Sequence, residues 1–424
     1  MDRNNINDVI MKYSSTYYKW EVLALLWIAY LLNQADRQIF NVVLPLIRAD
    51  LDLTDTQVGF IATTFNLVFA ILVPISGYLG DRISRKKVLT FSILLWSAAT
   101  MLSGLSNGLL MFILFRSTAT GMGEAMFGPA NYAMIADYHK KTRAVAMGIH
   151  QTAYYIGIIA SGLIAGYVGE RYGWRNAFYI FGSIGVIHGF ILLFRLKDKP
   201  KENDHELANT GQPQISFIES IKVLFKVPTA WILTIGFSGL IFVLTGYLTW
   251  TPDYLHETFS MNLASAGFHS MFYTHIAAFF GVLIAGSISD KLAVRNPANR
   301  ILLQSVGLLA AAPFIVLMGQ STTLVAVYIG FAGFGFMRAF FDANTYTVLY
   351  DVIPEKYHAS AAGVMQMIGF GIGSLSPVIL GALKPVIGMS MGISCLSVIW
   401  IVCSILMFIA YKFTYLRDYK RAQA

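Results

Sequence analysis

Long apolar runs, separated by short polar segments, follow one another along most of the 424 residues of this chain. A helix that crosses the hydrocarbon core of a bilayer needs about 20 consecutive, mainly apolar residues, and many of the runs reach that length. We predict twelve spanning helices, at about 20–44, 55–79, 87–105, 108–136, 143–167, 174–194, 230–254, 264–288, 301–319, 323–352, 360–383 and 388–411. The pattern therefore predicts an all-α membrane protein.

One long polar segment, from Arg195 to about Thr229, separates the sixth run from the seventh. Its first part is rich in charged residues and proline, which is typical of a linker. Its second part, Phe217 to Phe225, has apolar residues at helical spacing and predicts a helix that lies on the membrane surface. We therefore predict an N-terminal six-helix bundle at 1–194, a cytoplasmic linker at 195–229 and a C-terminal six-helix bundle at 230–424.

The distribution of basic residues supports this layout, because cytoplasmic loops of membrane proteins are enriched in lysine and arginine. With the N-terminus inside, the cytoplasmic segments hold 24 of the 31 basic residues and the predicted helices hold three. The remaining four lie on the opposite side: Arg48, Arg171, Arg175 and Lys384. Both termini are therefore expected to be cytoplasmic.

Composition agrees with a membrane protein. Hydrophobic residues make up 56% of the chain and charged residues 13%, whereas about a quarter of a soluble protein is charged. The net charge of +8 is explained by cytoplasmic loops that face anionic lipid headgroups, so the lipid bilayer is the expected partner and nucleic acid is not. The first apolar run is too long for a cleaved signal peptide and is expected to be retained.

Two related loops follow the second and the eighth predicted helices. The first is Gly77-Tyr78-Leu79-Gly80-Asp81-Arg82-Ile83-Ser84-Arg85-Lys86-Lys87, and a shorter copy is Gly286-Ser287-Ile288-Ser289-Asp290-Lys291-Leu292. Either alone is compatible with an ordinary basic cytoplasmic turn, but their equivalent places favour an internal repeat. The pattern resembles the signature loop of the major facilitator superfamily. We predict that Gly77, Asp81, Arg82, Arg85 and Asp290 belong to a cytoplasmic gate, where charges bond to helix ends in one state and release them in the other.

Six charged residues lie inside the predicted helices away from their ends, where charges are costly and usually face an interior cavity. They are Asp36 and Arg37 in the first helix, Arg116 and Glu124 in the fourth, and Arg338 and Asp342 in the tenth. Adjacent residues point about 100° apart on a helix, so Asp36 and Arg37 are expected to find partners on other helices. Arg338 and Asp342 have the i,i+4 spacing of a local ion pair, so a purely structural role is equally open for them.

These residue types are the components of a proton-coupled anion carrier. An arginine holds a carboxylate or phosphate through two hydrogen bonds, and a carboxyl group removed from water is suited to load and release a proton. Asp342 is one candidate for that proton. Polar side chains near these charges are candidates for contacts with sugar hydroxyls, namely Asn131, Gln151, Tyr154, Tyr155 and Trp250.

Two short motifs sharpen the family resemblance. Asn33 to Phe40 resembles the first-helix Asn-x-x-Asp-Arg pattern of the anion:cation symporter branch, which includes hexuronate and sugar-acid carriers, and of the Spinster-like branch. Gly121-Met122-Gly123-Glu124-Ala125 resembles the fourth-helix Gly-x-Gly-Glu-Ala pattern of the same two branches. The resemblance implies the major facilitator fold and an activity in transport by alternating access.

The resemblance also implies roles for individual residues. Arg37 would hold the substrate carboxylate, Asp36 and Glu124 would exchange protons, and Arg116 would be the fourth-helix arginine of the substrate site. One departure is visible: Arg116 lies eight residues before Glu124, where the family pattern has seven. On an α-helix this extra residue rotates Arg116 by about 100°.

The leading hypothesis is a proton-driven symporter for a small organic anion such as a hexuronate or another sugar acid. The alternative hypothesis is a Spinster-like carrier of lysophospholipid or a related amphiphile. The three intramembrane arginines favour a compact polar solute over such an amphiphile as the substrate. An enzyme is not expected, because the sequence has neither a metal-spaced His/Asp cluster nor a nucleophile with a base. We expect no metal and no cofactor, a monomer, and a location in the bacterial cytoplasmic (inner) membrane.

Overall fold

The computed structural model describes residues 3–198 and 217–423, with the backbone alone at 3–16, 77–82, 144, 217–218, 220 and 359. The first half contains α1 (Arg3–Asp50), α2 (Asp55–Arg82), α3 (Arg85–Ser103), α4 (Leu109–Phe112), the π-helix η1 (Ile113–Ala119), α5 (Thr120–Tyr138), α6 (Arg143–Tyr172) and α7 (Trp174–Arg195). The second half contains α9 (Phe217–Lys226), α10 (Pro228–Phe259), α11 (Leu263–Ala293), α12 (Asn299–Gln320), α13 (Leu324–Asp342), α14 (Thr345–Val352), the 3₁₀ helix η2 (Glu355–Tyr357), α15 (His358–Gly373), α16 (Ser376–Phe413) and α17 (Tyr415–Gln423).

The described residues confirm the predicted all-α class with twelve spans. The fourth span is assembled from α4, η1 and α5, and the tenth from α13 and α14. The eleventh span continues from α15 into α16, which turns at Gly388, where φ is 77°. The rest of α16 is the twelfth span. Within the described residues, eight helical segments are long and apolar enough to cross a membrane by length and composition alone.

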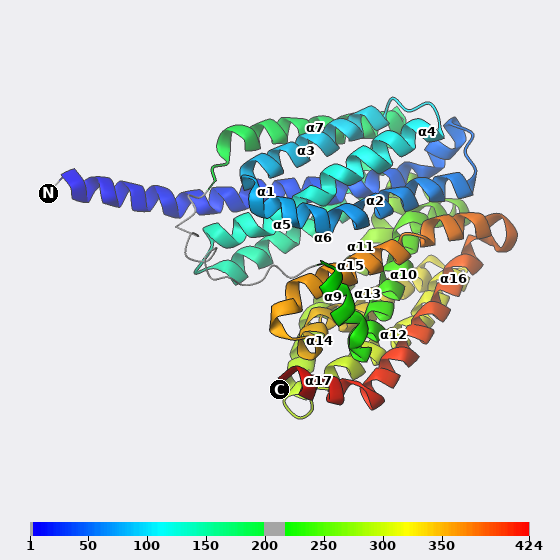
Figure 1. The fold of residues 1–424 in the computed structure, drawn as a ribbon. Coiled ribbons are helices and arrows are strands. Elements are labelled where there is room, and N and C mark those ends of the chain that lie inside the picture. The colour runs from blue at the N-terminus through cyan, green and yellow to red at the C-terminus, as the bar shows by residue number, and fades with distance from the viewer. Residues whose placement is uncertain (1–2, 199–216, 424) are drawn as a thin grey trace.

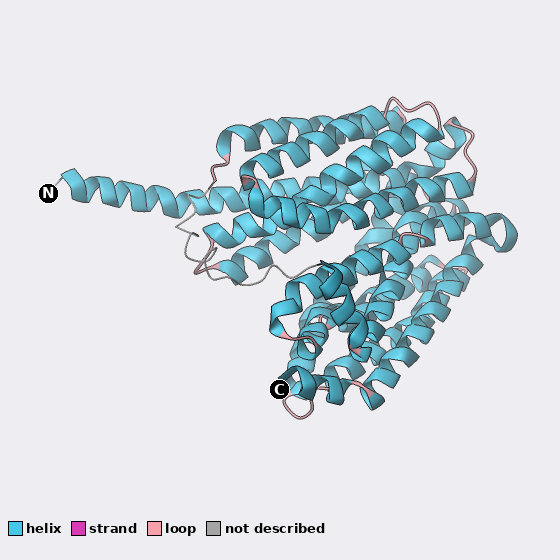
Figure 2. Ribbon diagram, viewed as in Figure 1, coloured by secondary structure: helices cyan, strands magenta, loops and turns pink. Residues whose placement is uncertain are grey.

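The spans form two bundles that lie side by side (Figures 1 and 2). Helices α1 to α7 make one bundle and α10 to α17 make the other (Figure 1), and α1 begins at the same end of the two bundles as that at which α17 lies, the end expected to be cytoplasmic. The bundles come together through α6 with α11, α2 with α15 and α16, and α1 with α10. The site between them is therefore built from helices of both halves.

Close backbone contacts join the bundles toward the outer ends of these helices. A Cβ added to Gly162 of α6 would meet the carbonyl group of Gly267 in α11, with the Gly267 carbonyl carbon only 2.7 Å away. Likewise, a Cβ on Gly59 of α2 would lie 2.8 Å from Cα of Val378 in α16. Because only glycine allows helices to approach so closely, these positions set how tightly the outer ends close.

The linker is described only in part. Residues 199–216, which the sequence assigns to it, lie outside the described residues. The expected helix after them is α9, which packs on α10 and α15. The ring centroids of Phe225 and Trp231 are 4.2 Å apart. The Tyr357 hydroxyl donates a hydrogen bond of 2.5 Å to the Glu219 carboxylate. The boundaries at 1–194, 195–229 and 230–424, and the surface location of α9, stay predictions.

We predict that Gly162→Leu opens the outer end. The added side chain overpacks the α6/α11 crossing, and overpacking costs about 1–3 kcal/mol, so the population should shift toward states in which the bundles separate there. Double electron–electron resonance spectroscopy with spin labels at positions 56 and 386, on the outer ends of α2 and α16, measures this shift. The distances between the labels should be longer than without the Gly162→Leu change.

Gly148→Leu is the matched control, because it lies on the same helix and a Cβ there would meet no atom within 4 Å. Identical distance distributions for Gly162→Leu and Gly148→Leu would show that the crossing does not limit outer closure.

Candidate functional site

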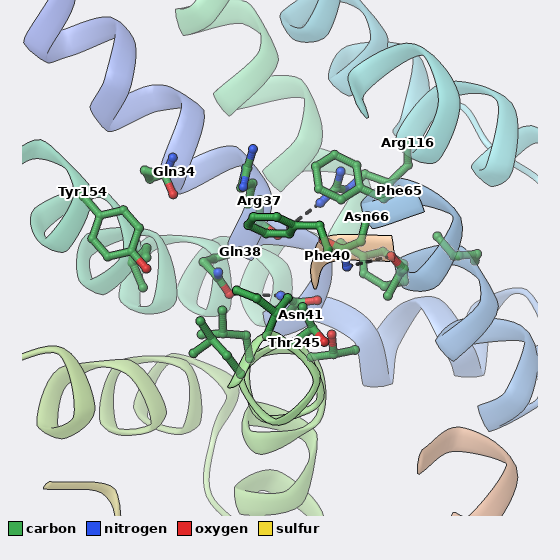
Figure 3. A pocket seen from close by; sticks show the side chains of 18 residues that line it. Gln34, Arg37, Gln38, Phe40, Asn41, Phe65, Asn66, Arg116, Tyr154 and Thr245 are labelled. Atoms are coloured by element: carbon green, nitrogen blue, oxygen red, sulfur yellow. Dashed lines mark hydrogen bonds between the residues drawn. The ribbon is translucent and has the colours of Figure 1, made fainter. Parts of the chain in front are cut away.

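Two adjoining cavities lie between the bundles. One has a volume of about 170 Å³ and the other about 600 Å³. Both are lined by Gln34, Arg37 and Tyr154 from the first bundle, and by apolar residues of α10 and α15 from the second. Figure 3 shows the smaller cavity, with Arg37 from α1, Arg116 from η1 and Thr245 from α10 around it.

Arg37 forms an ion pair with Glu124 across the α1/α5 contact. Its Nε donates to Oε2 of Glu124 at 2.6 Å, and the side chains are 22% and 0% exposed. The guanidinium lies 4.3 Å from the centroid of the Phe69 ring, and Oε1 of Glu124 is buried without a hydrogen-bond partner. An arginine has four further N–H donors on its terminal nitrogens, so Arg37 has donors for a ligand in the cavity.

The π-helix η1 explains the unusual spacing of Arg116. A π turn holds one more residue than expected for an α turn, so Ile113–Ala119 takes up the extra residue between Arg116 and Glu124. Arg116 therefore does not take the position, rotated by about 100°, that is expected for it on a regular α-helix. Arg116 lines the smaller cavity, donates from Nη2 to the carbonyl of Arg37 at 3.1 Å, and lies 4.3 Å over the Phe65 ring.

Asp36 lies behind this pair, on the side of α1 that faces the bundle interior. It is 4% exposed, and Oδ2 accepts a hydrogen bond of 2.7 Å from the Thr100 hydroxyl of α3. The charges of Glu124, Arg116 and Arg37 all act on its carboxyl group. The two acids and two arginines of the first bundle are therefore one electrostatic cluster.

A second ion pair faces the larger cavity from the opposite bundle. Arg338 and Asp342 of α13 both line it, with Nε and Oδ2 3.2 Å apart. The pair has the predicted i,i+4 spacing, yet this N–H is not aligned for a hydrogen bond, since Nε of Arg338 is buried without a partner.

The predicted sugar contacts divide between cavity and packing positions. Tyr154 lines both cavities, whereas Asn131, Gln151, Tyr155 and Trp250 line neither. Gln151 is exposed, Asn131 donates to Nε2 of His150 at 2.9 Å, and Trp250 donates to the carbonyl of Pro377 at 2.9 Å. Tyr155 packs on His275 and Phe279. Substrate contacts at these four positions stay predictions.

Several cavity residues were missed by sequence reasoning. The smaller cavity is lined by Gln34, Gln38, Asn41, Asn66 and Thr245. Amide side chains are rare within spanning helices and tend to face the protein interior. The four amide residues lie within the first two apolar runs, and this unusual position is the signal that would have identified them.

An ionic cluster closes the outer end between the bundles. Arg48 of α1 pairs with Asp55 of α2 and with Asp253 and Glu257 of α10. Lys384 of α16 pairs with the same three acids, at 3.3 Å, 2.7 Å and 2.8 Å. The Asp253 side chain is fully buried. The pairs of Arg48 with Asp253 and Glu257, and of Lys384 with Asp55, cross from one bundle to the other, so the cluster holds the outer end closed.

The predicted cytoplasmic gate is seen in part. Side chains at 77–82, which include Gly77, Asp81 and Arg82, lie outside the described residues. Arg85 pairs with Asp137 and donates to the Ala133 carbonyl at 3.2 Å, which ties the start of α3 to the end of α5. Asp290 pairs with Arg300 at 3.1 Å. A gating role for these residues stays a prediction.

A cavity that contains charged and amide side chains and lies between two membrane-spanning bundles, closed at one end by contacts that cross between them, is the arrangement expected of a membrane transporter. The chain belongs to the Major Facilitator Superfamily, whose family model matches residues 26–377. It is an integral, multi-pass membrane protein and a transporter, not an enzyme.

Several known transporters are similar to the chain over most of its length. It is 27% identical over 372 residues to the probable L-galactonate transporter of Escherichia coli (strain K12), covering 85% of this chain and 82% of that protein. It is 28% identical over 395 residues to protein spinster homolog 1 of Xenopus laevis, covering 87% and 73%.

A solved structure supports the fold. The crystal structure of a bacterial homolog to the human lysosomal transporter Spinster, in an inward-facing and unoccupied conformation, matches with a TM-score of 0.83 at 22% identity. The match covers 95% of this chain and 98% of that one. The predicted family and fold are confirmed.

We predict that Asp253→Asn weakens outer closure. Charge-assisted hydrogen bonds contribute about 1.5–3 kcal/mol, so loss of this buried anion between Arg48 and Lys384 should raise the outward-open population roughly tenfold or more. A cysteine at Thr249, beside the smaller cavity, should then react correspondingly faster with an impermeant maleimide added outside.

Asp52→Asn is the control, because Asp52 is an exposed carboxylate at the same end. Equal labelling rates in Asp253→Asn and Asp52→Asn would show that the ionic cluster does not hold the outer end.

Proposed function

We propose that the protein is a symporter that carries a small organic anion, such as a hexuronate or another sugar acid, together with protons. The observation that supports it most is the ion pair of Arg37 and Glu124 at the cavity between the bundles. The cytoplasmic membrane of a bacterium is the proposed location, and one chain is the proposed working unit, because helices of one chain complete the cavity.

Exchange of counterions would couple the anion to the proton. A substrate carboxylate that binds Arg37 replaces Glu124 as its partner. The displaced Glu124, which is fully buried, then loses its directly bonded counterion in a low-dielectric site, and this loss favours the neutral acid. Anion binding and proton uptake at Glu124 would therefore support each other. Asp36 is the proposed further proton site of this cluster.

The remaining cavity lining suits a hydroxylated solute. Gln38 and Asn41 hydrogen-bond each other at 3.0 Å, and Asn66 lies across from them on α2. Amides both donate and accept hydrogen bonds, so they match hydroxyl groups of either orientation. Phe65 and Phe370 add apolar surface for the carbon skeleton. These features support a sugar acid over a simple carboxylate.

A lysophospholipid or another amphiphile is the second candidate. Its support is the apolar side of the smaller cavity, made by Ile241, Leu244 and Leu248 of α10, together with the similarity to the spinster homolog. A lipid phosphate would use the same Arg37. Uptake of sugar acids and lysolipids into proteoliposomes, with and without a pH gradient, separates the two candidates.

We predict that Arg37→Gln lowers substrate affinity. The change removes a charge-assisted contact worth about 1.5–3 kcal/mol, which is roughly tenfold or more in the dissociation constant. Arg37→Lys should recover only part of it, because lysine keeps the charge and loses the planar fork. Calorimetric titration of purified protein with transported acids measures both effects.

Arg175→Gln provides the control, because it also breaks an arginine–carboxylate pair, with Asp50 at 2.5 Å, but outside the cavity. If Arg175→Gln and Arg37→Gln lose the same affinity, Arg37 is not the anion site.

We predict that Glu124→Gln separates binding from coupling. The amide resembles the protonated acid, so substrate counterflow should continue, yet a pH gradient should no longer drive accumulation because the group cannot titrate. Both assays are run on the same proteoliposomes. Accumulation at the wild-type level would make Glu124 structural and leave Asp342 as the next candidate for the proton.

A further inference from the structure

The larger cavity is bordered by an arginine–carboxylate pair from each bundle. Arg37 and Glu124 face it from α1 and α5, and Arg338 and Asp342 face it from α13. Tyr154 of α6 lines the same cavity as both pairs. A ligand in this cavity of about 600 Å³ therefore meets two permanent cations on opposite sides.

Arg338 is poorly satisfied within its own bundle. Its side chain is 6% exposed, but the side chain of its partner Asp342 is 31% exposed. The Nε of Arg338 has no hydrogen-bond partner. This buried N–H therefore lacks the hydrogen bond that would compensate for its removal from water. An acidic group in the cavity would supply it.

A purely structural pair is expected to look different. Structural ion pairs in membranes are aligned and enclosed, because the cost of burying both charges is then offset. Here the carboxylate is open to the cavity and the arginine is not aligned with it. Tyr346 and Gln366, which hydrogen-bond each other at 2.8 Å, line the same side and offer further polar contacts.

We propose that Arg338 holds a second acidic group, so that the preferred substrates are compact diacids with one carboxylate at Arg37 and the other at Arg338. This inference rests on the proposed function. The diacid displaces Asp342 from Arg338 as it displaces Glu124 from Arg37, and it joins the two bundles through the ligand. A monoacid leaves Arg338 with its internal partner.

The test compares matched acids on purified protein. A six-carbon sugar acid with one carboxylate, the corresponding diacid and the monomethyl ester of that diacid are titrated calorimetrically. The wild type should bind the diacid roughly tenfold or more tightly than the other two. The ester comparison needs no variant, so it holds even where a variant fails to fold.

The double variant Arg338→Gln/Asp342→Asn removes both charges and leaves neither unpaired. It should lose the preference for the diacid over the monoacid, whereas Arg37→Gln should weaken the binding of both acids. Thermal unfolding verifies that the variants fold.

The outcomes separate this inference from the function on which it rests. Equal affinities of the wild type for diacid, monoacid and ester would overturn the inference alone, as would a diacid preference that survives in the folded double variant. Failure to bind any of the three acids would overturn the proposed anion carrier and this inference together.

Discussion

The ion pair between Arg37 and Glu124 is the interaction on which the rest of the site depends. A guanidinium and a carboxylate held 2.6 Å apart inside a membrane bundle are stable only while each compensates the other. Around them, Arg116 bonds to the Arg37 carbonyl and Asp36 is held by Thr100. An anionic ligand can therefore bind to this charge cluster only if it replaces one of the carboxylates that the arginines already hold.

Alternating access adds a second constraint, because contacts between the bundles must be strong enough to close and weak enough to open. On the outer side, Arg48 and Lys384 share three acids across the interface, and Gly162 meets Gly267. Ion pairs and small-residue contacts of this kind are separable without exposing a large apolar surface. A ligand that binds both Arg37 and Arg338, as proposed, would hold the two bundles together while the cavity is occupied.

The sequence was sufficient for the topology and for the six intramembrane charges, because run lengths and loop charges depend on local composition. It was insufficient for pairings between helices. Arg37 and Glu124 are 87 positions apart, and Arg48 meets Asp253 across 205, so only the packed structure joins them. The π turn at Arg116 escaped prediction because hydrophobic period and helix propensity do not distinguish a π turn from an α turn.

Proton uptake on anion binding, measured with a pH indicator in weakly buffered detergent solution near neutral pH, tests the exchange of counterions at Arg37 directly. If the anion displaces Glu124 from Arg37, the protein should take up protons as the substrate is added, and the uptake should saturate at the binding stoichiometry. Saturating binding without a pH change would contradict the exchange of counterions and leave the ion pair with a structural role.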